Sequence, residues 1–518
     1  MPYTVPDLLM GGGRQRRQRI AVIDGGNSAS YEGVAAGAAR YSQIIAQLGI
    51  APGDRVALLL PRSIETLAVF FGAQLAGAVT VFISERLRPR QIAQILVDAG
   101  AAAIFTTPRL RPLLRDSRLA PDRVIDVGRG ARGSAPPARA RVIGQDLAAL
   151  AYTSGSTGPP KGVMLTHDAL ISGAAIVADY LRLSSADRTL ALLPWSFDYG
   201  LSQVLSTLYA GGTIVIQRSA FPPELCRTLA GTGVTGMAGV PSLWGLLRQR
   251  NSPFLKLQFG ELRYLTNSGG PLPAGLVQDI RRSHPQAALY LMYGLTEAFR
   301  STYLPPDLAD TRPTSIGAAV PNTEILVVSD EGRPCRAGET GELVHRGPTA
   351  ALGYWRDPEA TARVFRARPF APARPGAPET VVYSGDYVRA DSEGYLYHLG
   401  RRDELFKSRG MRVNPAEIEA EILGSGMVTE AAVFSTGSRG PDPVIVAAVL
   451  PADMRSFELS ELADYCRGEL PSHMLPAEIV PMRALPRTPT GKTDRIALRA
   501  RLAAAGTLAD GPRTEAGR

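Results

Sequence analysis

The sequence predicts an α/β protein. We expect a large N-terminal domain of helix-covered β-sheets plus a small antiparallel barrel-like part, and a small mobile α+β C-terminal domain. Three observations predict this class. Helical and strand patterns alternate through the first half, short alternating strands with Gly turns begin near Thr323, and a charged, Gly-punctuated stretch begins near Gly400. Strands that alternate with helices indicate parallel sheets covered by helices.

The elements of the first half follow from hydrophobic spacing. Residues 31–50 space apolar side chains at three and four and stop at Gly49, which predicts a helix and its end. Residues 54–60 are a short apolar run and predict a buried strand. The longest uncharged run, residues 67–83, is too short for a comfortable membrane span and is interrupted at Gly77, so a buried helix followed by a strand is expected. "AAAIFTT", "GGTIVIQ" and "GVTGMAGV" continue the alternation.

The residue pattern changes twice later in the chain, near Thr323 and near Gly400, and each change predicts a further structural part. "TEILVVSDEGRPCRAGETGELVHRG" predicts short antiparallel strands, and "GRRDELFKSRGMRVNPAEIEAEIL" leads into an acidic amphipathic helix. "AAVFST", "VIVAAVL" and "LSELADYCRGEL" then predict a small α+β domain. The polar tail, residues 506–518, is expected to be disordered.

Composition excludes several classes of protein. The chain has 518 residues, 45% hydrophobic and 20% charged, which is typical of a globular protein. Its net charge of +9 comes from arginines spread along the chain, so a solvated basic surface is favoured over a nucleic-acid site. Cys226, Cys335 and Cys466 are widely spaced, which argues against disulfides and a zinc site. With no signal-peptide pattern, we expect a cytoplasmic protein with no membrane or nucleic-acid partner.

Lysine is rare in this chain and therefore informative. Only Lys161, Lys256, Lys407 and Lys492 stand among 57 basic residues. An ammonium is a compact charge on a flexible stem, which arginine does not replace at a tight site. Lys161 follows "TSGSTGPP", a Gly-, Ser- and Thr-rich loop whose backbone can closely approach anionic oxygens. The loop lacks the Walker pattern but predicts phosphate binding.

"TSGSTGPPKG" is similar to the signature loop of the adenylate-forming superfamily, which comprises acyl-CoA synthetases, luciferases and the adenylation domains of nonribosomal peptide synthetases. Other motifs of that superfamily follow in order: "SGGPL", "MYGLTE", "YSGDYV", "GRRDELFKSRG" and "PRTPTGKTDR". The resemblance therefore covers nearly the whole chain. It implies an enzyme that joins a carboxylate to the α-phosphate of ATP, releases pyrophosphate and passes the acyl group to a thiol.

The resemblance also implies roles for individual residues. Lys492 matches the catalytic lysine, Glu297 the Mg²⁺ ligand and Thr296 a ligand of the α-phosphate. Mg²⁺ is typically held through one or two carboxylates and substrate phosphates, which suits Glu297. Tyr293 would stack on adenine, and Asp386 would accept the ribose hydroxyls. The other expected ATP-binding residues are Thr153, Ser154, Gly155, Ser156, Thr157, Gly158, Lys161, Gly269, Gly270 and Arg401.

The same resemblance divides the chain into moving parts. Residues 1–400 would be the core that binds ATP and the acid, residues 401–404 the hinge, and residues 405–505 the mobile domain. Asp403 would be the hinge residue, and Gly410 would line the channel for a phosphopantetheine arm. Lys407 matches a position used in some conformations, but an exposed strand lysine is an equal interpretation.

Asp198 in "LPWSFDYGLSQ" is the main clue to the acid. It resembles the aspartate of amino-acid-activating domains that pairs with the substrate's α-ammonium, whereas the alternative is an aspartate that caps the next helix. Arg300 could bind an acidic substrate or pair with a structural carboxylate. Residue-by-residue transfer places the substrate pocket at Asp198, Tyr199, Ser202, Ala238, Thr266, Ser268, Met292, Gly294, Arg300 and Ser301.

We therefore predict a stand-alone ligase that adenylates a small carboxylic acid, most readily an amino acid. Its cofactors would be ATP and Mg²⁺, and its acyl group would pass to the phosphopantetheine thiol of a separate carrier protein, because no carrier-protein signature occurs in the chain. The alternative is an acyl-CoA or aryl-CoA ligase that uses free coenzyme A. A non-catalytic nucleotide-binding relative is disfavoured because both Lys492 and Glu297 are present.

Overall fold

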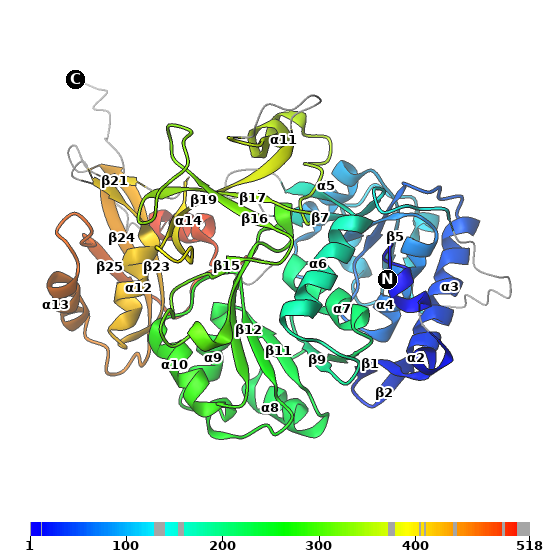
Figure 1. The fold of residues 1–518 in the computed structure, drawn as a ribbon, viewed down its shortest axis with the longest axis horizontal. Helices are drawn as coiled ribbons and strands as arrows, with labels where there is room; N and C mark the ends of the chain where they lie inside the picture. The colour runs from blue at the N-terminus through cyan, green and yellow to red at the C-terminus, as the bar shows by residue number, and fades with distance from the viewer. Residues whose placement is uncertain are drawn as a thin grey trace.

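The chain folds into stacked layers of helices and sheets, followed by a smaller C-terminal part (Figure 1). This computed structural model describes residues 2–11, 13–128, 140–153, 160–370, 379–402, 406–408, 411–438, 443–488 and 493–504. The short helices α1 (Asp7–Met10) and α2 (Arg14–Gln18) precede the first sheet.

The large sheet forms the centre of the N-terminal part. Its middle strands are parallel, with antiparallel strands at both edges, as the alternation of helices and strands predicts. In spatial order the strands are β15 (Ala318–Ala319), β14 (Thr302–Leu304), β13 (Ala288–Tyr293), β12 (Tyr264–Asn267), β11 (Gly236–Gly239), β9 (Arg188–Ala191), β10 (Thr213–Ile216), β1 (Ile20–Asp24) and β2 (Asn27–Ser30).

A second sheet, the N-terminal sheet, is parallel except at β8. Its strands in order are β6 (Val124–Asp126), β5 (Ala101–Thr106), β3 (Arg55–Leu58), β4 (Val79–Phe82), β7 (Leu147–Thr153) and β8 (Lys161–Thr166). Lys161 therefore begins the antiparallel edge strand of this sheet, directly after the Gly- and Ser-rich loop.

Four helices lie between the two sheets and bury the largest apolar cluster. They are α3 (Tyr31–Gln47), α4 (Ile64–Leu75), α6 (His167–Tyr180) and α7 (Asp198–Tyr209). The outer face of the N-terminal sheet is covered by α5 (Pro89–Ala99) and η1 (Arg111–Leu114), and η2 (Pro121–Arg123) precedes β6. The outer face of the large sheet is covered by α8 (Pro222–Gly231), α9 (Pro241–Arg248), η3 (Phe254–Lys256) and α10 (Ala274–Ser283).

An antiparallel sheet follows the two layered sheets, as the pattern of short alternating strands after Thr323 predicts. It is built from β16 (Glu324–Val328), β17 (Thr340–Arg346), β18 (Phe365–Ala367), β19 (Thr380–Ala390) and β20 (Leu396–Arg401). The short helices η4 (Thr296–Ala298) and α11 (Pro358–Val364) contact its strand β19, whereas η5 (Pro306–Leu308) contacts β13 of the large sheet.

The C-terminal part has its own two apolar clusters on either side of a sheet. That sheet consists of β23 (Val428–Ser438), β24 (Pro443–Pro451) and β25 (Glu478–Pro481). Helices α12 (Pro415–Gly424) and α13 (Leu459–Glu469) pack on one face, and α14 (Arg495–Ala504) packs on the other. The hairpin β21 (Phe406–Ser408) and β22 (Met411–Val413) comes before them.

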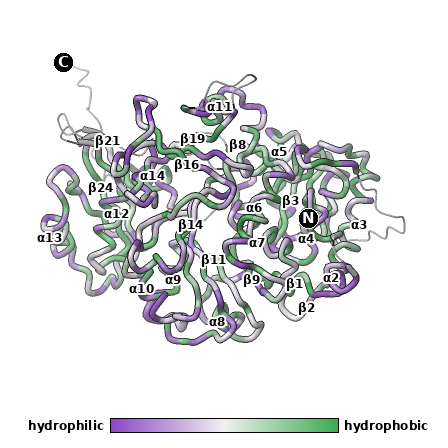
Figure 2. The backbone as a smooth tube through the Cα atoms, in the orientation of Figure 1, coloured by the Kyte–Doolittle hydropathy of each residue, from purple (hydrophilic) through white to green (hydrophobic). Residues whose placement is uncertain are grey.

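The predicted fold class is confirmed. Helix α3 ends where Gly49 was expected to stop it, and the run 67–83 splits at Gly77 (φ +73°) into helix α4 and strand β4. Figure 2 separates hydrophobic segments in the layered core from hydrophilic ones such as α2, which has no buried residue. Within the described ranges, no helix is long and apolar enough to cross a membrane. The three cysteines form no disulfide.

Candidate functional site

A cluster of polar side chains joins the end of β13 to the antiparallel sheet. Tyr293 is the last residue of β13, and its hydroxyl donates to Oδ2 of Asp386 at 2.5 Å. On the neighbouring strand β20, Nε2 of His398 lies 3.3 Å and Nε of Arg401 lies 3.9 Å from Oδ1 of Asp386. Two predicted ATP-binding residues, Tyr293 and Arg401, therefore meet at the carboxylate of a third, Asp386.

The carboxylate of Asp386 stays ionised despite its burial. Burial raises the pKa of Asp386, but the hydrogen bond from His398 and the charges of His398 and Arg401 outweigh it and leave this pKa below its ordinary value. Burial, and then the charge of Asp386, raises the pKa of Tyr293 far above its ordinary value. The tyrosine therefore remains a neutral donor, and the aspartate presents a fixed negative charge.

A second cluster surrounds Glu297 on η4. Its Oε1 accepts a hydrogen bond from the hydroxyl of Tyr354 at 2.6 Å. Nζ of Lys161 lies 5.2 Å from the centre of the Tyr354 ring and 3.7 Å from Oδ2 of Asp357. Burial, followed by the charge of Glu297, raises the pKa of Tyr354. The predicted Mg²⁺ ligand Glu297 and the predicted phosphate-binding Lys161 therefore both lie beside Tyr354, one at its hydroxyl and the other at its ring.

The loop after β12 packs against Pro241 at the start of α9. Gly269 has φ +85°, a conformation that glycine adopts without strain, and the side-chain nitrogen of Asn267 donates to the carbonyl of Gly270 at 2.9 Å. A Cβ on Gly270 would lie 3.0 Å from Cγ of Pro241. Thr296 begins η4, immediately before Glu297. In the sequence, Gly269 and Gly270 come before Tyr293, and Thr296 comes three residues after it.

A small cavity lies against the face of the large sheet that α6 and α7 cover. Its volume is about 20 Å³, enough to admit a water molecule. Five predicted substrate-binding residues line it, together with residues that the sequence did not suggest. The lining is Val177, Leu181, Thr189, Tyr199, Ser202, Gln203, Ser206, Tyr264, Thr266, Met292 and Arg300.

Asp198 begins helix α7 but does not line this cavity. Its side chain is buried, and Oδ1 accepts the backbone N–H of Tyr199 at 2.8 Å. This contact is what a carboxylate at a helix start makes with the free N–H groups there. None of the described basic side chains lies within ion-pair distance of the carboxylate. The geometry is therefore compatible with both interpretations of Asp198.

The remaining predicted pocket residues lie close by, outside the cavity wall. Ala238 is buried in the apolar cluster that contains Tyr199 and Met292. Ser268 and Ser301 are buried, and Oγ of Ser301 has no hydrogen-bond partner among the described residues. A Cβ on Gly294 would lie 3.4 Å from Nη1 of Arg300.

Sequence reasoning missed several residues of these clusters. His398 lies three residues before Arg401, and pairing of β20 with β19 brings it to Asp386. Tyr354 and Asp357 stand in no motif that the sequence reading recognised. Thr189, Gln203, Ser206 and Tyr264 face the cavity because they lie on strands and a helix whose inward faces only the fold determines.

Several predicted residues fall outside the described ranges. These are Lys492, Asp403, Gly410 and the loop residues Ser154, Gly155, Ser156, Thr157 and Gly158. For Thr153 at the end of β7 and Lys407 in β21, only the backbone is described. Their predicted roles stay predictions.

Comparison with known families gives the class of this protein. The family model described as "AMP-binding enzyme" matches residues 12–355, and "AMP-binding enzyme C-terminal domain" matches residues 417–492. The chain therefore belongs to the AMP-binding enzyme family of adenylate-forming ligases.

Two curated relatives have the same identity but different architectures. The chain is 32% identical over 96% of its length to a dimodular nonribosomal peptide synthase of Bacillus subtilis, of which it spans only 22%. It is also 32% identical over 92% of its length to a feruloyl-CoA synthase of an Amycolatopsis species, of which it covers 95%.

Solved structures agree with this assignment. An anthranilate CoA ligase in complex with anthranoyl-AMP superposes with a TM-score of 0.88 at 25% identity, covering 98% of this chain and 99% of that one. An o-succinylbenzoate coenzyme A synthetase from Bacillus subtilis, in complex with ATP and a magnesium ion, gives 0.82 at 26% identity and covers 95% and 99%.

Proposed function

We propose that this protein adenylates a small amino acid with ATP and transfers the aminoacyl group to the phosphopantetheine thiol of a carrier protein. In the first step, an oxygen of the acid's carboxylate forms a bond to the α-phosphorus of ATP, and the bond to pyrophosphate breaks. In the second step, the thiol sulfur displaces AMP from the acyl carbon. A cytoplasmic location and a carrier-protein partner stay predictions.

The side chains that meet in the site suit ATP and Mg²⁺. Asp386 offers a fixed carboxylate acceptor for ribose hydroxyls, and His398 and Arg401 hold it in place. Glu297 offers one carboxylate, and Tyr354 orients it through a hydrogen bond. Mg²⁺ is commonly bound by one or two carboxylates plus substrate phosphates, and it would neutralise phosphate charge there.

The observation that favours an amino acid is the buried carboxylate of Asp198. A buried negative charge without a cation is unfavourable, and the described residues supply no cation at ion-pair distance. A substrate ammonium would supply that cation. The hydrogen bond from the backbone N–H of Tyr199 offsets only part of the burial.

A second candidate is an acyl-CoA or aryl-CoA ligase that uses free coenzyme A. The specific observation that favours it is the same Tyr199 N–H bond, which gives Asp198 a structural role at the start of α7. The similarity to feruloyl-CoA synthase, at 95% coverage of that enzyme, points in the same direction.

Asp198→Asn separates the two candidates, because asparagine keeps an acceptor for the Tyr199 N–H and loses the charge. With amino acids, we expect kcat/KM for pyrophosphate release to fall by about 100-fold, the consequence of losing a partly buried ion pair worth about 3 kcal/mol. With the same acids lacking the α-amine, we expect a change of less than about threefold. The measurement is pyrophosphate release over paired acids.

The deciding quantity is the ratio of kcat/KM between each amino acid and the same acid without its α-amine, rather than the total activity of the variant. If wild-type protein and Asp198→Asn use the amine-free acids equally well and the amino acids poorly, the amino-acid assignment is wrong and the substrate is an acid without an α-amine. Thioester formation with a phosphopantetheine-loaded carrier protein, measured beside free coenzyme A, then identifies the acceptor.

A further inference from the structure

Arg300 has an unusual position at the wall of the small cavity. Its side chain is only 2% exposed, and it lines the cavity together with Tyr199, Thr266 and Met292. The chain reaches this position through Phe299, which has φ +40°, a value that bulky residues avoid. The Phe299 ring is buried beside Gly173, where a Cβ would lie 2.5 Å from it. Packing around Phe299 therefore maintains a strained turn that directs Arg300 inward.

The guanidinium of Arg300 is only partly satisfied. Nη1 donates to the carbonyl of Phe299 at 2.7 Å, and the guanidinium carbon lies 5.0 Å from the Tyr199 ring centre and 5.4 Å from the Phe299 ring centre. Nε and Nη2 are buried and have no hydrogen-bond partner within the described ranges. These two nitrogens form one edge of the planar group, and their N–H bonds point the same way.

The sequence left open whether Arg300 binds an acidic substrate or pairs with a structural carboxylate. The described residues do not supply the structural ion pair. No described carboxylate lies within ion-pair distance of it. A buried arginine without an anion is strongly unfavourable, because its hydration is lost and nothing replaces it. Ring contacts and one carbonyl offset only part of that loss.

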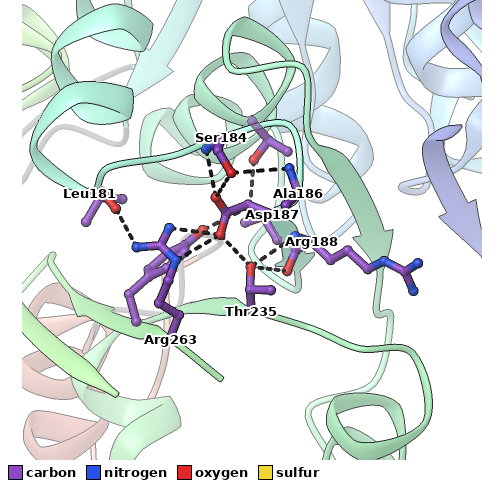
Figure 3. A network of polar contacts seen from close by, with 10 residues as sticks. Leu181, Ser184, Ala186, Asp187, Arg188, Thr235 and Arg263 are labelled. Carbon is purple, nitrogen blue, oxygen red and sulfur yellow. Dashed lines mark hydrogen bonds and ion pairs between the residues drawn. The ribbon is translucent and has the colours of Figure 1, made fainter. Parts of the chain in front are cut away.

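Arg263 shows how the same protein treats a structural arginine (Figure 3). Its Nε and Nη2 both donate to Oδ1 of Asp187, at 3.1 and 2.8 Å, and Nη1 donates to the carbonyl of Leu181 at 2.9 Å. Asp187 also accepts from Ser184 and Thr235. This network ties the starts of β9, β11 and β12 together. The edge that Arg263 uses for its carboxylate is the edge that Arg300 leaves without a partner.

We propose that the acid activated by this protein carries a second carboxylate, which binds side-on to Nε and Nη2 of Arg300. A carboxylate matches that edge with two parallel hydrogen bonds and supplies the missing negative charge. The inference rests on the proposed function, in that the cavity serves the acid that is adenylated. With an amine at Asp198 the substrate is an acidic amino acid, and without one it is a dicarboxylic acid.

The size and position of the cavity agree with this substrate class. Thr266 and Met292 line it, and both precede residues of the nucleotide site by only a few positions: Thr266 comes shortly before Gly269, and Met292 directly before Tyr293. A volume of about 20 Å³ admits about one water-sized group, so the cavity has no room for a long alkyl chain. Hydroxyls of Tyr199 and Thr266 pair with each other there, at 2.5 Å, which keeps the wall polar.

The test uses acids that differ only in the distal group, as pairs of carboxylate and carboxamide. The probes are glutamate and glutamine, aspartate and asparagine, glutarate and glutaramate, succinate and succinamate, and isophthalate and its monoamide. For wild-type protein, we expect kcat/KM for pyrophosphate release to be about 100-fold higher for the carboxylate of the preferred pair, because the amide leaves a buried charge unpaired.

Two variants ask whether Arg300 causes that preference. In Arg300→Gln we expect the ratio to fall below about 5, and in Arg300→Lys, which keeps the charge without the fork, to be intermediate. Loss of folded protein lowers kcat/KM for the carboxylate and the carboxamide equally, so it leaves their ratio unchanged. The ratio for wild-type protein tests the proposal independently of any variant.

Each outcome is decisive. If wild-type protein prefers the carboxamides or neutral aryl and aliphatic acids, the inference about Arg300 is overturned while acid adenylation stands. A carboxylate preference that survives in Arg300→Gln also overturns it, because another group would then recognise the anion. Absence of pyrophosphate release with every acid tested overturns the proposed function itself.

Discussion

Two histidines in the N-terminal part are buried in their neutral form. Burial lowers the pKa of both His167 and His345 to about 4. Nδ1 of His167 accepts the backbone N–H of Val5 at 3.2 Å, which needs the unprotonated nitrogen. Nε2 of His345 lies 3.1 Å from the hydroxyl of Thr349. The His167 side chain holds the Val5 segment in place only as long as its Nδ1 is unprotonated.

The free energy of unfolding should therefore fall as the pH is lowered from about 6.5 to about 4. The unfolded chain binds protons at these histidines from about pH 6.5 downward, whereas the folded chain resists until about pH 4. Stability is thus present above the unfolded pKa and lost through this window. The shift is equivalent to roughly 3 kcal/mol per histidine. Urea unfolding at several pH values measures the slope.

His167→Asn is the matched variant for that slope. Asparagine keeps a side-chain acceptor for the Val5 N–H and does not titrate. We expect the variant to lose less stability between pH 6.5 and 4 than wild-type protein, by up to about 3 kcal/mol. An unchanged slope would mean that His167 does not stay neutral in the folded protein.

At the scale of elements, the start of α7 is held against the preceding chain by a glycine. A Cβ on Gly200 would lie 2.1 Å from the carbonyl oxygen of Pro194 and 3.0 Å from that of Leu193. This close approach sets the depth of the first turn of α7, which bears Asp198, Tyr199 and Ser202. The placement of the predicted substrate-binding residues in that turn therefore depends on the absence of a side chain at Gly200.

Gly200→Ala should destabilise the protein and disturb the acid site together. The alanine methyl cannot avoid backbone atoms, so α7 must shift, and overpacking of this kind costs roughly 1–3 kcal/mol. Gly245→Ala in α9 is the control, because no atom lies within 4 Å of its Cβ position. There we expect a gain of about 0.5–1 kcal/mol from helix propensity.

Thermal unfolding and KM for the acid check both variants. Our expectation is a lowered midpoint and a raised KM for Gly200→Ala only. Equal effects of the two substitutions would show that the contact with Pro194 is unimportant.

At the scale of the whole molecule, the proposed mechanism needs a C-terminal part that delivers a charge and then withdraws it. The C-terminal part has its own apolar clusters around β23–β25, so its core does not depend on the large sheet. Lys492 lies outside the described residues, and its catalytic role and the hinge at 401–404 are proposals. A lysine on a part that moves would matter in one half-reaction and be absent from the other.

Lys492→Ala should therefore lower the rate of adenylate formation by about 100-fold to 1,000-fold, the usual effect of removing one group that stabilises a transition-state charge. Thioester formation from a supplied acyl-adenylate should change far less. Exposed Lys256, whose Nζ donates to the carbonyl of Arg250, is the matched control, and Lys256→Ala should leave both steps unchanged. An equal loss in both half-reactions for Lys492→Ala would refute the two-state mechanism.

The sequence by itself determined the fold class and the family. Alternation of period-2 and helical patterns predicted β3, α4 and β4, and Gly49 and Gly77 predicted where helices α3 and α4 stop. These features are local, because a residue's own backbone preferences and its near neighbours decide them. Ordered motifs gave candidate residues in the same way, one short stretch at a time.

Only the tertiary structure decided which side chains meet. Tyr293 and Asp386 are 93 residues apart, Tyr354 and Glu297 are 57 apart, and neither His398 nor Tyr354 was expected from the motifs. The sequence left open whether Arg300 pairs with a carboxylate of the protein, because that depends on which side chains the fold places beside it. Sheet register and helix packing set such long-range contacts, and no local pattern records them.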